Sequence, residues 1–80
     1  MAVTEYSLTA TVWANCGAAP CALQLQSMGP IKFRIESGAP SDASTAGTIV
    51  DASDPNVDIG LTGTLYARSL GSTDKIAVER

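Results

Sequence analysis

The sequence contains no histidine among its 80 residues, and this absence removes several kinds of chemistry. Histidine is the usual acid and base near neutral pH, the partner of catalytic serines and cysteines, and the commonest metal ligand. The glycine-rich motifs that bind phosphates and dinucleotides are also missing. We therefore predict that the protein is not an enzyme, with no catalytic residues, no metal and no cofactor.

Charged and aromatic residues are also scarce, at 16% and 5% of the chain. Only five residues are basic and the net charge is −3, whereas binding to nucleic acid needs a basic face that neutralises phosphates. No apolar run approaches the length of about 18 residues that a membrane span requires. The first residues lack the charged and apolar regions of a secretory signal. We expect no nucleic-acid partner, no membrane and no secretion.

The short length limits how much stability the fold can obtain from its own core. A domain of this size buries only about 60% of its unfolded surface, and small scaffolds usually add a staple or a partner. We predict one domain over residues 1–80, completed by contacts with other subunits, and hence a homo-oligomer.

Alternation of apolar and polar residues is clearest in residues 31–36 (IKFRIE), which predict a half-buried strand. Similar patterns predict strands over residues 6–13, 22–28, 48–50, 57–61, 63–69 and 75–80. Gly29 and Pro30 separate two such runs, which favours a hairpin. Without a helical period, the pattern predicts an all-β fold, a small antiparallel β-sandwich or barrel of about six to seven strands.

Two segments lack this alternation. Residues 37–47 (SGAPSDASTAG) contain only small side chains and one charge, Asp42. A loop of this length in a small domain is usually functional or mobile, so we predict a surface loop that makes lateral contacts. Residues 1–5 are predicted to form a second contact arm.

Cys16 and Cys21 are the only cysteines, separated by a Gly-Ala-Ala-Pro turn pattern. They do not form a zinc pair, because a second pair of ligands is absent. Their spacing also differs from that of redox-active pairs. Two alternatives stay open from the sequence: two free, partly buried thiols, or a disulfide that closes a short loop and adds modest stability.

Acidic residues gather between positions 42 and 58, namely Asp42, Asp51, Asp54 and Asp58. Carboxylates suit calcium, but the spacing does not match an EF-hand loop. Aspartates also favour turns through local hydrogen bonds. We therefore interpret them as turn residues, and nothing in the sequence pairs two of them for hydrolysis.

Trp13 interrupts the hydroxyl-bearing face of the first predicted strand. It could cover the rim of the core, or it could anchor a subunit contact, where tryptophan is enriched.

The order of segments from Ala22 onward resembles small β-sandwich modules of tailed bacteriophage virions. The stretches that carry the resemblance are ALQLQSMGPIKFRIESGAPS and IVDASDPNVDIGLTGTLYARSLGSTDKIAVER. Such modules occur as capsid decoration (cement) proteins and as parts of head or tail fibres and adaptors. Residues 1–21, including the cysteine segment, fall outside the resemblance.

The resemblance implies a virion structural protein, assembled in the host cytoplasm, that binds the major capsid protein or another virion protein and forms a trimer. It also implies that the final strand is a central member of the sheet and that Tyr66 and Arg68 are displayed on its outer face. Trp13, Tyr66, Arg68 and Asp42 are the predicted contact residues. The alternatives are a fibre, adaptor or tail component and, third, a carbohydrate-binding module with Trp13 or Tyr66 as its stacking platform.

Overall fold

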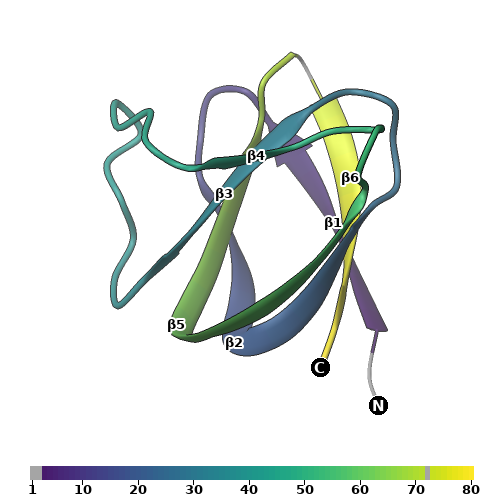
Figure 1. The fold of residues 1–80 in the computed structure, drawn as a ribbon. Helices are drawn as coiled ribbons and strands as arrows, with labels where there is room; N and C mark the ends of the chain where they lie inside the picture. The colour runs from purple at the N-terminus through teal and green to yellow at the C-terminus, as the bar shows by residue number, and fades with distance from the viewer. Residues whose placement is uncertain (1–2, 72) are drawn as a thin grey trace.

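Six antiparallel strands form one sheet that curls into a half-barrel (Figure 1). The computed structural model describes residues 3–71 and 73–80. Within them the strands are β1 (Val3–Thr9), β2 (Ala14–Leu25), β3 (Ile31–Glu36), β4 (Thr48–Val50), β5 (Asn56–Ser69) and β6 (Thr73–Glu79). The predicted all-β, antiparallel fold class is confirmed.

The strand order across the sheet is β1-β6-β2-β5-β3-β4. The final strand β6 therefore lies between β1 and β2, as expected for a central member of the sheet. The predicted hairpin around Gly29 and Pro30 is wrong, because β5 lies between β2 and β3 and pairs with both. The alternating pattern identified these strands, but local turn residues could not reveal that a strand distant in sequence separates them.

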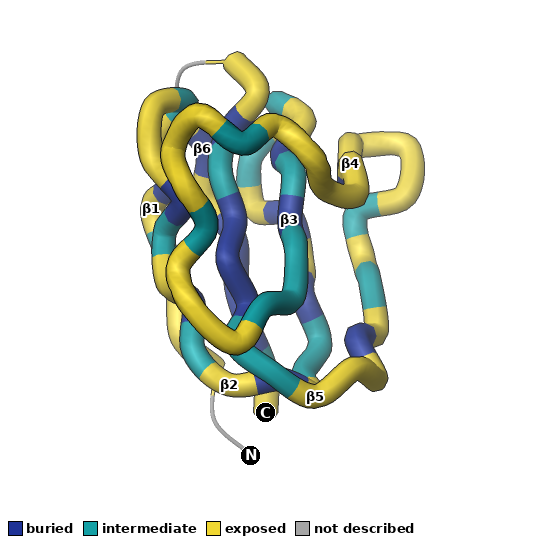
Figure 2. Tube along the Cα trace, turned by 90° about the vertical axis from the view of Figure 1, so that its left-hand side faces the viewer, coloured by how far each residue is buried: buried dark blue, intermediate teal, exposed yellow. Residues whose placement is uncertain are grey.

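The hydrophobic core lies on the concave face of the sheet. Alternate residues of neighbouring strands point to this face. The large apolar side chains that are fully buried there are Leu8, Leu23, Ile31, Leu65, Ile76 and Val78. In Figure 2 their buried positions lie on strands from β1 across to β3, whereas the long connections are mostly exposed. Full burial of each such side chain stabilises the fold by roughly 1.5–3 kcal/mol.

The segment predicted as a turn around the cysteines is instead the first half of β2. Its pairing with β5 shifts register between Asn15 and Ala18 and again between Ala19 and Cys21. Gly17 adopts a φ of +88° at the first irregularity, a conformation that glycine tolerates best. Turn-forming residues here produce bulges within a strand, which the sequence pattern does not distinguish from a turn.

The side chain of Arg80 covers this irregular part of β2. Its Nε donates to the carbonyl of Ala18 at 2.9 Å and its Nη2 donates to the carbonyl of Cys16. Bulges leave main-chain groups without partners in the ladder, and the guanidinium supplies donors to two of them. Arg80 thereby fixes the bulged strand against the end of β6.

The first strand differs from its prediction at both ends. Residues 10–13 do not continue it but connect β1 to β2. Residues Val3–Glu5, predicted as part of a contact arm, pair with Ala77, Val78 and Glu79 of β6. The alternation that predicted the first strand began only at Tyr6, so the pairing of these residues was not expected. Residues 1 and 2 of the predicted arm lie outside the described residues.

A buried carboxylate closes one end of the half-barrel. Asp74 is 7% exposed. Its Oδ1 accepts a hydrogen bond from the hydroxyl of Ser27, and its Oδ2 accepts one from the hydroxyl of Ser69 at 2.6 Å. Each hydroxyl also accepts a hydrogen bond from a main-chain amide. The amide of Lys75 donates to Ser27 at 3.2 Å, and the amide of Gly71 donates to Ser69 at 3.1 Å. The network ties the segment after β2 and the end of β5 to β6.

We expect the substitution Asp74→Ala to lower the free energy of unfolding by about 1–3 kcal/mol, because it leaves two hydroxyl donors without their acceptor. Urea denaturation followed by circular dichroism measures the change. Asp54→Ala is the matched control, since Asp54 is an exposed turn residue. Equal stabilities of the two variants would contradict a structural role for Asp74.

Candidate protein-contact site

The outer face of the sheet carries a cluster built around Trp13. This residue directly precedes β2 and is 8% exposed. The guanidinium of Arg34 lies 5.6 Å from the centre of its ring, and that of Arg68 lies 5.2 Å from it. Cation–π contacts at these distances contribute roughly 0.5–2 kcal/mol each, most when shielded from water.

The register of β3 and β5 places the two arginines together. Lys32 lies opposite Arg68, and Arg34 lies opposite Tyr66. Arg34 and Arg68 are therefore diagonal neighbours on one face, a separation that long side chains span. Ala14 lies opposite Ala67 on the other side of β5, which brings the preceding residue, Trp13, beside Arg68.

The loop of residues 37–47 folds against this cluster. The main-chain amide of Trp13 donates to Oδ1 of Asp42 at 3.3 Å, and its indole Nε1 donates to the carbonyl of Ser44 at 3.1 Å. Buried tryptophans usually find such a partner for the indole N–H. Trp13 thus holds the loop at two points.

The basic residues of β3 and β5 add further bonds to the same loop. Arg68 Nη1 donates to the carbonyls of Asp42 at 2.9 Å and Ser44 at 3.4 Å. Arg34 Nη1 donates to the hydroxyl of Ser44 at 2.6 Å. Lys32 Nζ donates to the carbonyl of Thr45. Hydrogen bonds from charged donors are stronger than neutral ones, so a loop without large apolar side chains is still held in place.

Arg68 and Arg34 each have one more partner that connects the cluster to the rest of the sheet. Arg68 Nη2 donates to the carbonyl of Ala10, in the connection that follows β1. Arg34 forms an ion pair with Glu36 on its own strand. We call Trp13, Lys32, Arg34 and Arg68 together the loop clamp.

The loop clamp leaves most side chains of the loop facing solvent. It contacts mainly main-chain carbonyls, whereas Ser41, Ala43 and Thr45 are exposed. Figure 1 shows the loop projecting beside β3 and β4. The arrangement presents a surface of small residues on a fixed backbone, and it provides no nucleophile–base pair.

The structure brings together three of the four predicted contact residues. Trp13 and Arg68 belong to the loop clamp, and Asp42 lies on the exposed loop that they hold. Trp13 is buried against this loop of its own chain, so it covers the fold and does not present its ring to a partner. The expected display of Tyr66 is wrong, since it is 6% exposed.

Sequence reasoning missed Lys32 and Arg34 as loop contacts. The signal for both was available, because they occupy the outward positions of a strand that leads directly into a long loop of small residues. What the sequence lacked was the position of β5, which brings Arg68 beside them.

No aromatic ring is available on the surface as a stacking platform. Trp13, Phe33 and Tyr66 are buried, and Tyr6 is half-buried against the core. The chain has no other aromatic residue. The predicted sugar platform on Trp13 or Tyr66 therefore does not exist in this fold.

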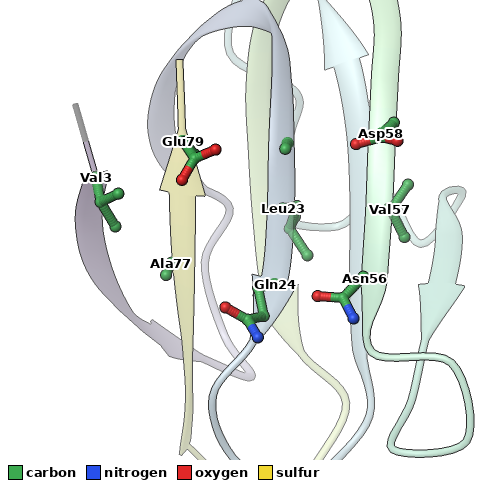
Figure 3. Close-up of a pocket in the computed structure, with 9 residues that line it drawn as sticks. Val3, Leu23, Gln24, Asn56, Val57, Asp58, Ala77 and Glu79 are labelled. Atoms are coloured by element: carbon green, nitrogen blue, oxygen red, sulfur yellow. The ribbon is translucent and has the colours of Figure 1, made fainter. Parts of the chain in front are cut away.

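A shallow groove opens near the paired ends of β1, β6, β2 and β5 (Figure 3). The polar side chains around it are Gln24, Asn56, Asp58 and Glu79, which come from three strands. None of the described residues that line the groove is basic. Within residues 3–71 and 73–80, no group of three or more acidic or cysteine side chains is close enough to hold a metal ion.

Both cysteines of β2 are free thiols in the structure. Cys16 is fully buried, and burial raises its pKa from 9.0 to about 12, opposed by the positive charge of Arg80. Burial also raises the pKa of the half-buried Cys21 thiol. Because the thiolate is the reactive form, neither is activated as a nucleophile.

The turn after β4 accounts for one of the clustered aspartates. Oδ1 of Asp51 accepts from the amide of Ser53 at 3.0 Å and from its hydroxyl. These hydrogen bonds lower the pKa of the Asp51 carboxyl, and the bond from the Ser53 hydroxyl has the largest effect. This local role agrees with the interpretation of Asp51 as a turn residue. The same interpretation is wrong for Asp58, which lies within β5 and pairs with Ala22 of β2.

Comparison with protein-family models, with curated proteins and with solved structures gave no match for this chain. No helix in the described part of the chain has the length and apolarity needed to cross a membrane.

Stability should fall more steeply above pH 9 in the native protein than in the variant Cys16→Ala. A thiol whose pKa is raised in the folded state stabilises the fold fully below its unfolded pKa of 9.0, and this contribution is lost as the pH rises toward about 12. The slope is at most about 1.4 kcal/mol per pH unit. Urea denaturation at pH 8, 9 and 10 measures the difference, and parallel curves for the two proteins would contradict it.

Replacing Arg68 with methionine should release the loop. The change removes the hydrogen-bond donors to the carbonyls of Asp42, Ser44 and Ala10. We expect hydrogen exchange at the Ser44 amide and at the Trp13 indole N–H to accelerate about tenfold or more, because charge-assisted hydrogen bonds that hold the loop are lost. NMR hydrogen exchange measures both sites. Lys75→Met is the matched control, since Lys75 is exposed outside the loop clamp. Unchanged exchange in Arg68→Met would rule out the clamp.

Proposed function

We propose that the chain is a non-enzymatic structural protein of a tailed-phage particle that binds the outer capsid shell as a decoration protein. The observation that carries this proposal is the loop clamp, which fixes the backbone of residues 37–47 while leaving its small side chains exposed. The resemblance of the segments from Ala22 onward to virion modules supplies the identity of the assembly.

A fixed loop of small side chains suits binding to a flat protein surface. Ordering of flexible segments opposes association, and a segment that is already ordered avoids this cost. The loop carries a single charge, Asp42, so few charges lose their water on contact. Small side chains also allow close approach of the two backbones.

Decoration stabilises a shell by mass action. A protein that binds only the assembled shell shifts the equilibrium toward assembly. Each contact can be weak if many copies bind one particle. The module needs no catalytic group for this role, and its place is the virion, where its partner is the major capsid protein.

The second candidate is a fibre, adaptor or other tail component, to which the same resemblance applies. It predicts an elongated oligomer and no affinity for empty shells. A carbohydrate-binding function ranks below both, because all four aromatic rings are buried or half-buried.

Co-sedimentation with empty capsids tests decoration, with the variant Ala43→Arg as the decisive comparison. Ala43 is exposed on the loop, and a bulky cation there should weaken capsid binding at least tenfold without unfolding the protein. Ala52→Arg makes the same change in the exposed turn after β4 and should bind like the native chain.

Saturable binding of the native chain that Ala43→Arg alone disrupts would support decoration through the loop. Equal weakening by both variants would count against the loop as the contact surface. Absence of binding by the native chain, together with an elongated oligomer in solution, would reject decoration in favour of a tail component.

A further inference from the structure

The strand β1 forms one edge of the sheet and lacks the features that usually protect an edge. No described strand lies on its other side. Its pairing with β6 runs without a bulge from Val3 to Thr9, and it contains no proline, no lysine and a single charge, Glu5. Edge strands of natural sheets are usually short, carry a bulge, or bear charged side chains that prevent pairing with another strand. The opposite edge, β4, is only three residues long.

Hydrogen bonds within the sheet determine which groups of β1 point outward. The carbonyl of Lys75 accepts from the amide of Gln26 at 2.8 Å, so Lys75 directs its backbone groups toward β2. Alternate residues of an antiparallel strand direct these groups to opposite sides. Ile76 therefore faces β1, where Tyr6 is its partner. The outward backbone groups of β1 then belong to Val3, Glu5, Ser7 and Thr9.

Only one symmetric register uses all of these groups. If two copies of β1 pair antiparallel with Tyr6 facing Tyr6 of the second copy, Val3 lies opposite Thr9 and Glu5 lies opposite Ser7. Every outward group is then paired, with about eight backbone hydrogen bonds. A shift that places Glu5 opposite Glu5 of the second copy is disfavoured, because like charges directly opposite each other destabilise a strand pair.

We propose that β1 is a dimerisation edge that pairs with β1 of a second copy of this chain in the Tyr6-centred register. The partner is a second copy because the strand complements itself: its one charge faces a neutral hydroxyl residue, and no other charge lies on it. The dimer has two-fold symmetry, in place of the trimer that the resemblance implies. Pairing of β1 with β4 of another copy would generate a ring or an open filament, but β4 offers fewer residues for pairing.

Opposite charges placed at Ser7 test the register. Ser7→Lys sets a lysine opposite Glu5 in both halves of the dimer, and we expect its dissociation constant to fall roughly two- to thirtyfold. Ser7→Glu sets two carboxylates face to face and should raise the dissociation constant by a similar factor. Sedimentation equilibrium of the 80-residue chain over a concentration series measures both.

Thr62→Lys and Thr62→Glu are the matched controls for net charge, since Thr62 is exposed on β5 away from this edge. They should leave dimerisation within about twofold of the native chain, because charges away from the contact are largely screened by salt. Hydrogen exchange adds an independent readout: the amides of Glu5, Ser7 and Thr9 should slow in the dimer, whereas those of β4 should not.

A protein that stays monomeric to millimolar concentration would overturn the proposal. Equal effects of the Ser7 and Thr62 pairs, or slowed exchange in β4, would also overturn it. Failure of the dimer proposal can be told apart from failure of the decoration proposal. The capsid experiment compares variants of the 37–47 loop and the 51–55 turn, none of which lies on β1.

Discussion

A single curled sheet has only one concave face, and this constraint governs the rest of the structure. The core fills that face, so the outer face needs cover from connections. Tyr66 and Trp13 occupy that outer side and are nevertheless buried. The long loop between β3 and β4 supplies cover, and because it lacks large apolar side chains, it is fixed by hydrogen bonds rather than by packing.

The basic residues of the chain mainly donate hydrogen bonds that fix irregular main-chain segments. Lys32, Arg34 and Arg68 donate to the loop, and Arg80 donates to the bulged part of β2. Four of the five basic residues thus contact backbone carbonyls. An arginine satisfies several carbonyls at once through its planar fork of donors. The few cations of the sequence therefore serve mainly to satisfy main-chain carbonyls.

The sequence predicted the parts of the fold that depend on local alternation. Ile31, Phe33 and Ile35 identified β3 and its inward face correctly, and the antiparallel class followed from the absence of a helical period. Pairing between distant segments was not predictable in the same way. Proline and glycine in β2 indicated a turn, but bulges accommodate the same residues, and the position of β5 between β2 and β3 leaves no local pattern.

The candidate site shows the same division between local and distant information. The unusual position of Trp13 and the composition of residues 37–47 were visible in the sequence. Their contact was not, because it depends on Arg34 and Arg68 becoming diagonal neighbours across β3 and β5. The resemblance to virion modules implied that Tyr66 is displayed on the outer face, yet outward residues in the middle of a sheet can be covered by neighbouring side chains and loops.

The two proposed contact surfaces are formed by different segments. The dimerisation edge is β1, whereas the clamped loop joins β3 to β4 at the other end of the strand order. The curl of the sheet brings this loop beside the connection that follows β1, because Arg68 donates to the carbonyls of both Ala10 and Asp42. A dimer paired through β1 would carry two such loops. A dimer with two such loops binds a repeating surface more tightly than either loop alone when the spacing of sites matches its own. Under the two proposals together, the β1 edge would supply the bivalency that a loop poor in charge and in large side chains requires.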